Sequence, residues 1–264
     1  MSFSKELQAL KEFGCDDRCV LSVYLNTNPG DPEALNGGWK IHLKSGLKRI
    51  DEYLTASKDE KEMKAFSELR KRVVKEVEDH SMELTKGVVI FASLEPELWS
   101  VNYVQVPVKT NFHWEDHAVT EQLEYMYKAY PEAGIILPSF GEVRILCTAM
   151  GHVNGEVTYD FDPNLEGWAE RSKASDAHNI GMGSTSIDAI EPRLRENLLR
   201  FYKGMGAIVE RLKKERGWQQ IHITGEADLA NAFAETLREK PASCIYKNLN
   251  NSSPNDIVHQ IFEK

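Results

Sequence analysis

A short stretch rich in glycine and hydroxyl groups, Gly181-Met182-Gly183-Ser184-Thr185-Ser186, has the composition and position best suited to chemistry. It directly precedes the longest amphipathic helix that the sequence predicts, over residues 190–216. Glycine-spaced backbone before a helix can present N–H groups and the positive end of the helix dipole to an anion or a reaction centre. A plain connector is the alternative, because Asp188-Ala189-Ile190-Glu191 is a capping box and Pro192 falls in the first helical turn.

Two histidines offer a possible metal site. His113 and His117 are four residues apart and could share one face of a helix. A zinc protease would carry its general base directly after the first histidine, where this chain has Trp114. The plainer interpretation is the start of a surface helix, so we predict no metal site here.

Acidic and hydroxyl residues gather around the polar segment 164–179. A two-metal nuclease would need carboxylates on the central strands, but the predicted strands 134–138 and 219–224 carry none. A hydrolase triad would need a nucleophile elbow, which is also missing. We therefore predict neither enzyme and no cofactor. The residues considered are Asp160, Asp162, Ser172, Ser175, Asp176, His178 and Ser184.

The composition is that of a soluble globular protein, with 41% hydrophobic and 28% charged residues. The net charge of −9 argues against non-specific coating of nucleic acid. The longest apolar runs are too short to cross a membrane, and residues 1–13 do not form a signal peptide. Four cysteines are too few for a disulfide framework in a chain of this length, so we predict free thiols and a cytoplasmic location. They are Cys15, Cys19, Cys147 and Cys244.

The elements that must position these residues divide the chain near Pro131. Residues 1–130 predict an N-terminal α/β domain with the order β-α-α-β-β, followed by a helix over 115–130. Residues 131–264 predict three strands of an antiparallel meander, with a hairpin turn at Asn154-Gly155, and then α-β-α-β-α. That is the element order of an RNase H-like domain, so the predicted fold class is α/β with two domains.

Three segments resemble a known family. They are Val20–Thr27, the junction of Gly181–Ser186 with a helix that carries Arg193, Arg195 and Arg200, and Ile221–Gly225. Together they resemble the bacterial relatives of archaeal and eukaryotic peptide-chain release factors, a group that includes peptidyl-tRNA hydrolases of ribosome rescue. In that family a Gly-x-Gly-Gly-Gln loop immediately precedes a long arginine-bearing helix, and its glutamine helps to position water for hydrolysis of the peptidyl-tRNA ester.

The resemblance carries over residue by residue. Gly181 and Gly183 match glycines, Ser184 replaces the second glycine of Gly-Gly-Gln, and Thr185 replaces the glutamine. It implies a catalytic position at Gly183, Ser184 and Thr185. It also implies RNA contacts from Gly181, Ser186, Arg193, Arg195, Arg200 and Lys203.

The resemblance further implies a translation-associated factor that engages the ribosome or a tRNA acceptor end through loop 164–189 and helix 190–216. With the glutamine replaced, we expect weak or no peptidyl-tRNA hydrolysis; an enzyme of this family would be a peptidyl-tRNA ester hydrolase. The alternative function is that of a non-catalytic protein–protein adaptor that keeps the fold without binding the ribosome.

Overall fold

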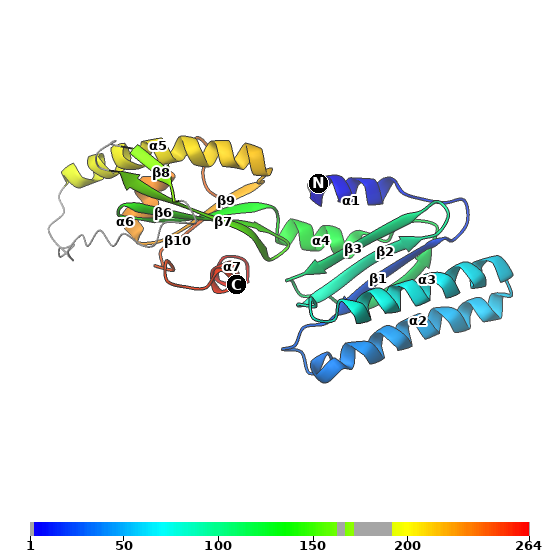
Figure 1. The fold of residues 1–264 in the computed structure, drawn as a ribbon. Coiled ribbons are helices and arrows are strands. Elements are labelled where there is room, and N and C mark those ends of the chain that lie inside the picture. The colour runs from blue at the N-terminus through cyan, green and yellow to red at the C-terminus, as the bar shows by residue number, and fades with distance from the viewer. Residues whose placement is uncertain (1–2, 163–166, 172–191, 264) are drawn as a thin grey trace. The chain divides into compact units, whose positions relative to one another are not determined.

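The computed structural model describes residues 3–162, 167–171 and 192–263. It divides the chain into two compact units, Met1–Ala129 and Tyr130–Lys264. Each unit is mixed α/β and is built on one sheet, four-stranded in the first and six-stranded in the second (Figure 1).

The first unit is an antiparallel sheet with strand order β3-β2-β1-β4. Helices α2 and α3 lie side by side on one face of this sheet, and α1 and α4 lie on the other. Apolar residues at helical spacing, such as Leu43, Leu47, Leu69 and Val73, are fully buried between α2, α3 and the strands. The elements are α1 (Phe3–Glu12), β1 (Val20–Asn26), η1 (Leu35–Gly37), α2 (Gly38–Ser57), α3 (Glu60–Asp79), β2 (Gly87–Ser93), β3 (Leu98–Val104), β4 (Asn111–Glu115) and α4 (Glu121–Ala129).

The predicted helix over 115–130 is wrong at its beginning. Residues 111–115 form strand β4, which pairs with β1, and the helix starts only at Glu121. The pairing buries Trp114, whose ring packs edge-on against Phe66 at 5.4 Å. His113 therefore lies on a strand and shares no helix face with His117. No group of three or more His, Cys, Asp or Glu residues suited to a metal ion occurs among the described residues.

The prediction of free thiols is wrong for two of the four cysteines. Cys15 and Cys19 form a disulfide, whereas Cys147 and Cys244 are free. The backbone N–H groups of Cys15 and Cys19 donate to the carbonyl oxygens of Asp116 and Glu115, so both ends of the 15–19 segment are held beside the end of β4. This places the two Cα atoms 6.4 Å apart, within the range that a disulfide can bridge.

The second unit is a sheet with strand order β10-β9-β5-β6-β7-β8. The predicted antiparallel meander is confirmed in β5, β6 and β7, and β9 and β10 are parallel to β5, as the helix–strand alternation predicts. One face packs against α5 and α6, and the other packs against α7. The elements are β5 (Ala133–Ser139), β6 (Glu142–Ala149), β7 (His152–Asp162), β8 (Gly167–Glu170), α5 (Pro192–Arg216), β9 (Gln220–Thr224), α6 (Ala227–Ala234), β10 (Ser243–Ile245) and α7 (Pro254–Phe262).

The hairpin turn between β6 and β7 lies earlier than predicted. It is formed by Met150 and Gly151, whose φ angles are +50° and +76°. Strand β7 continues through Asn154 and Gly155, where its register against β6 shifts by one residue at Asn154. Two residues with positive φ suit the twist of a two-residue hairpin. Burial of the Met150 side chain and a 3.1 Å hydrogen bond from its N–H to the Tyr130 carbonyl offset the cost of this conformation in a non-glycine residue.

A close approach between α5 and the segment after α6 depends on Gly206. A Cβ atom at this position would lie 2.6 Å from the carbonyl oxygen of Thr236. We predict that Gly206→Ala destabilises the second unit by about 1–3 kcal/mol, because the backbone must move to admit the methyl group. Hydrogen exchange of β9 peptides at increasing denaturant concentrations measures this.

Gly204→Ala is the matched control. Gly204 is exposed on the same helix, where alanine has the higher helix propensity, so this change should stabilise by up to about 1 kcal/mol. Equal effects of the two substitutions would contradict the close approach.

Candidate functional site

The predicted site residues differ in how far the structure describes them. Gly181, Gly183, Ser184, Thr185 and Ser186 lie outside the described residues. Helix α5 confirms the predicted helix from Pro192 to Arg216. Its backbone contains the three predicted arginines, whose side chains also fall outside the description, while Lys203 is exposed to solvent. These arginines are Arg193, Arg195 and Arg200.

Tyr202 fixes the N-terminal half of α5 to the sheet. Its side chain is fully buried, and its ring packs edge-on against Phe233 at a centroid distance of 5.2 Å. The hydroxyl donates a 2.9 Å hydrogen bond to the carbonyl oxygen of Ser139, the last residue of β5. Burial, followed by the nearby charge of Glu226, raises the pKa of this phenol well above its ordinary value, so it stays a neutral donor. The residues just before Tyr202 therefore extend from a fixed point.

The segment predicted as one loop, 164–189, contains a strand. Gly167–Glu170 forms β8, which pairs with β7 at the sheet edge, with Asp160 opposite Ala169 and Phe161 opposite Trp168. The N–H of Arg171 continues the ladder by donating to the carbonyl oxygen of Thr158 at 2.8 Å. The prediction is wrong here because β7 offers an unpaired edge, and backbone pairing to that edge outweighs the polar local composition.

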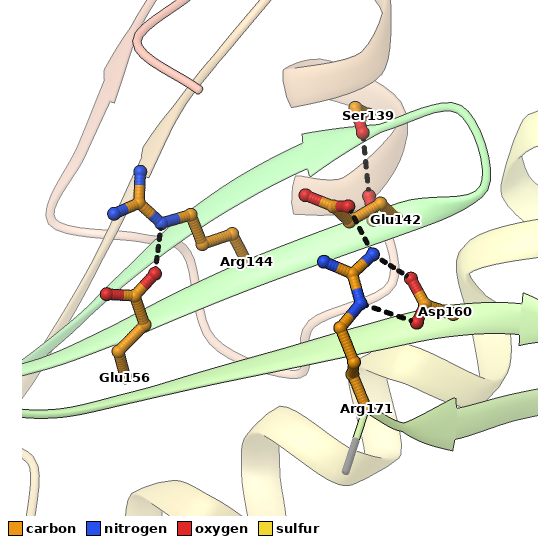
Figure 2. Close-up of polar contacts among 6 residues, drawn as sticks. All are labelled: Ser139, Glu142, Arg144, Glu156, Asp160 and Arg171. Carbon is orange, nitrogen blue, oxygen red and sulfur yellow. Dashed lines mark hydrogen bonds and ion pairs between the residues drawn. The ribbon is translucent and has the colours of Figure 1, made fainter. Parts of the chain in front are cut away.

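Arg171, Asp160 and Glu142 form an ion cluster where β8 ends (Figure 2). Glu142 and Asp160 lie directly opposite each other on β6 and β7. The Arg171 guanidinium lies between them, with Nε 2.8 Å from Asp160 Oδ2 and Nη2 2.6 Å from Glu142 Oε2. The bonds to Asp160 and then to Glu142 raise the pKa of Arg171, so the bridging charge is permanent.

The ion cluster offsets the repulsion that two facing carboxylates would otherwise feel. All three side chains are partly exposed, so its contribution to stability is modest, about 1 kcal/mol or less per pair. Its larger consequence is geometric, because it attaches the chain to the sheet at Arg171, immediately before residue 172.

Arg144 makes a second connection on the same strands. It pairs with Glu156 (Figure 2). Its side chain is only 13% exposed. Its Nη1 donates to the carbonyl oxygens of Asn250 and Ser252, at 3.0 and 3.2 Å. Arg144 thus holds the segment that leads into α7, while Arg171 holds the segment that follows β8.

One residue considered for a nuclease centre, Asp160, takes part in these contacts. Its carboxylate faces that of Glu142, and Arg171 pairs with both. The side chain of Asp162, and Ser172, Ser175, Asp176 and His178 entirely, lie outside the described residues.

Arg171, Glu142 and Tyr202 were not among the predicted site residues. A hairpin turn at Asn154-Gly155 would place residue 160 opposite residue 149, so the predicted register does not bring Glu142 beside Asp160. The turn at Met150-Gly151 does. Arg171, which bridges the two carboxylates, is placed by β8, a strand that the local sequence does not predict.

No helix in the part of the chain that the structure describes is long and apolar enough to cross a membrane.

The family described as "Bacterial archaeo-eukaryotic release factor family 5" matches residues 131–263. Uncharacterized protein YocB of Bacillus subtilis (strain 168) is 30% identical over 245 residues, covering 93% of this chain and 92% of that protein.

Two solved structures align with 98% of this chain and 72% of their own chains, each at 15% sequence identity. One is the crystal structure of an archaeal translation termination factor, with a TM-score of 0.34. The other is described as an archaeal protein, with a TM-score of 0.33.

Proposed function

Because this chain belongs to bacterial archaeo-eukaryotic release factor family 5, we propose that it is a translation-associated factor. It engages the ribosome or a tRNA acceptor end through residues 164–189 and helix α5. The observation that carries this proposal is the position of the glycine stretch, directly before a long helix inside the segment that matches the family.

We also propose that residues 131–264 form an RNase H-like domain of the release-factor middle type and that residues 1–130 form a separate N-terminal α/β domain. The strand order and directions in the second unit support the first assignment, since β5, β6 and β7 form a meander and β9 and β10 add to it in parallel. The division of the chain into two compact units supports the second.

We assign the role of each site residue from its resemblance to the family's loop and helix. The RNA-contacting set comprises Gly181, Ser186, Arg193, Arg195, Arg200 and Lys203, and the catalytic position comprises Gly183, Ser184 and Thr185. Contacts described on both sides of this segment support the assignment: the ion cluster at Arg171 and the buried phenol of Tyr202 provide fixed points before and after it. Such supports reduce the freedom that binding must restrict.

We propose that peptidyl-tRNA hydrolysis is weak or absent. Thr185 stands where the family has glutamine, and a β-branched residue is restricted in the backbone angles that it takes. No metal or cofactor enters this proposal, and the site of action is the cytoplasm.

Ribosome co-sedimentation tests the proposal. We predict that the wild-type chain pellets with ribosomes or stalled ribosomal complexes. Replacing Arg193, Arg195 and Arg200 by alanine should lower the apparent affinity for ribosomes at least about tenfold. The slope of log affinity against log salt concentration should become less steep by roughly one for each lost phosphate contact.

The control removes the same charge from the other end of α5. Arg211, Lys214 and Arg216 are exposed there, and their triple alanine variant should bind like the wild type. Absence of the wild-type chain from all ribosomal fractions would overturn the proposal and favour the protein–protein adaptor.

A further inference from the structure

We propose that the groove between α2 and α3 is a binding site for a short linear polyphosphate, either free or as the phosphate chain of a nucleotide. This groove has a volume of about 700 Å³. Five of its lining residues are cationic: Lys44, Lys48, Arg70, Lys71 and Lys75. None of them belongs to the site proposed for ribosome binding.

The packing of two amphipathic helices builds this groove. Leu43 and Leu47 on α2, and Leu69 on α3, are buried toward the sheet. The residue that follows each of these three, Lys44, Lys48 and Arg70, is therefore turned toward the outer seam between the helices. The two helices lie side by side over the sheet (Figure 1).

Two ion pairs join α2 to α3, one toward each end of the groove. Lys44 Nζ lies 3.3 Å from Glu78 Oε1 at one end, and Arg70 Nη1 lies 2.7 Å from Asp51 Oδ2 toward the other. The earlier residue of α2 pairs with the later residue of α3, and the later residue of α2 pairs with the earlier residue of α3. The two helices therefore form an antiparallel hairpin. They hold the walls of the groove together without using the lysines between them.

Lys71 and Lys75 are the free cations of the groove. Both are exposed, and neither has an ion-pair or side-chain hydrogen-bond partner within the described part of the chain. They are four residues apart, so they lie one above the other on α3, about 6 Å apart along the helix axis. Lys44 and Lys48 repeat this spacing on α2.

The spacing of Lys71 and Lys75 is unfavourable without a ligand, because like charges at i, i+4 on a helix repel and lower stability. On α2, by contrast, Lys44 pairs with Glu78 and Lys48 pairs with Glu52. A bound anion would convert this repulsion into attraction. The hydroxyls of Ser45 and Ser67, which also line the groove, add neutral donors suited to phosphate oxygens.

The ends of the groove favour a compact anion over an extended nucleic acid. Glu78 and Asp79 line one end, and the Asp51 carboxylate occupies the other, where it pairs with Arg70. A nucleic-acid strand that continued past either end would meet negative charge, whereas binding along a strand needs an extended basic stripe. The volume also lies in the range of small-ligand sites.

Isothermal titration of the full chain with inorganic tripolyphosphate tests this proposal. We expect saturable binding that weakens by about tenfold or more in Lys71→Ala/Lys75→Ala, because two unshared charge-assisted contacts are lost. The control is Lys61→Ala/Lys64→Ala, which removes the same charge from exposed positions of α3 outside the groove. It should bind tripolyphosphate within about twofold of the wild type.

A parallel titration with ATP distinguishes the two sources of the phosphate chain. Tighter binding of ATP than of tripolyphosphate would indicate a nucleotide, and equal or weaker binding would indicate free polyphosphate; either result supports the site if Lys71 and Lys75 are required. Three results would overturn it: no saturable binding of tripolyphosphate, an equal loss in the control, or tighter binding of a single-stranded RNA that depends on Lys71 and Lys75.

Discussion

Replacing Tyr202 with alanine should lower the free energy of unfolding of the second unit by about 3–5 kcal/mol. The side chain is fully buried between α5 and the sheet, where it packs against Phe233 and donates to the Ser139 carbonyl. Truncation removes the ring from the core and leaves that carbonyl without its donor, and both effects destabilise. Hydrogen exchange of β5 and β9 peptides at increasing denaturant concentrations measures the loss for this unit alone.

Tyr202→Phe separates the two effects. It keeps the ring and removes only the hydroxyl, so it should cost about 1 kcal/mol, rising toward roughly 3 kcal/mol if the Ser139 carbonyl finds no water. A loss below about 1.5 kcal/mol for the alanine variant would contradict the role of Tyr202 in attaching α5 to the sheet.

The same experiment bears on the proposed site. Because Tyr202 lies two residues after Arg200, its removal should loosen the backbone that carries the predicted RNA contacts. Ribosome binding should therefore weaken in Tyr202→Ala and stay close to the wild type in Tyr202→Phe.

The long helices and buried strands could be predicted because their residues carry the pattern themselves. In α5, Met205 and Leu212 lie on one face at helical spacing, and both are buried. The run 134–138 is apolar throughout because β5 is covered on both faces, by α5 and α6 on one side and by α7 on the other. Order and direction of the strands then follow from short connections and right-handed crossovers.

Two short edge strands could not be predicted in this way. Strands β4 and β8 lie at sheet edges, and their existence depends on pairing with β1 and β7. The turn was misplaced for a similar reason, since Asn154-Gly155 is the stronger local pattern, while the pairing of β6 with β7 fixes the turn at Met150-Gly151. The disulfide depends on contacts of Cys15 and Cys19 with residues about 100 positions away.

In the candidate site too, local patterns could be predicted, and contacts between distant segments could not. The glycine stretch and the helix behind it were predicted from local patterns; α5 confirms the helix, and the glycine stretch lies outside the described residues. The ion cluster joins Glu142, Asp160 and Arg171 through two strand pairings, so no single segment reveals it. The groove between α2 and α3 could not be predicted for the same reason. Lys44 and Lys75 line one groove only because the two helices pack antiparallel.

Ser184→Gly/Thr185→Gln should raise peptidyl-tRNA hydrolysis on ribosomes by a factor of the order of 10², the lower end of what a well-placed group that handles water contributes. Together with Gly183, the double variant rebuilds the family's Gly-Gly-Gln sequence at positions 183–185. Glycine restores backbone freedom at position 184. The glutamine amide both donates and accepts hydrogen bonds and can hold a water molecule at the ester, which the shorter threonine side chain cannot reach in the same way.

The informative control is Ser184→Gly/Thr185→Ala, which gives the same glycine at position 184 without the amide. If the gain requires the glutamine, the segment before α5 reaches the ester in the same way as the family's loop, and the wild-type chain has kept the placement while losing the chemistry. Equal rates for the two double variants would contradict that placement even if ribosome binding were confirmed. Turnover by the wild-type chain as fast as by the glutamine variant would instead show that Thr185 is sufficient, and the proposal of weak hydrolysis would be wrong.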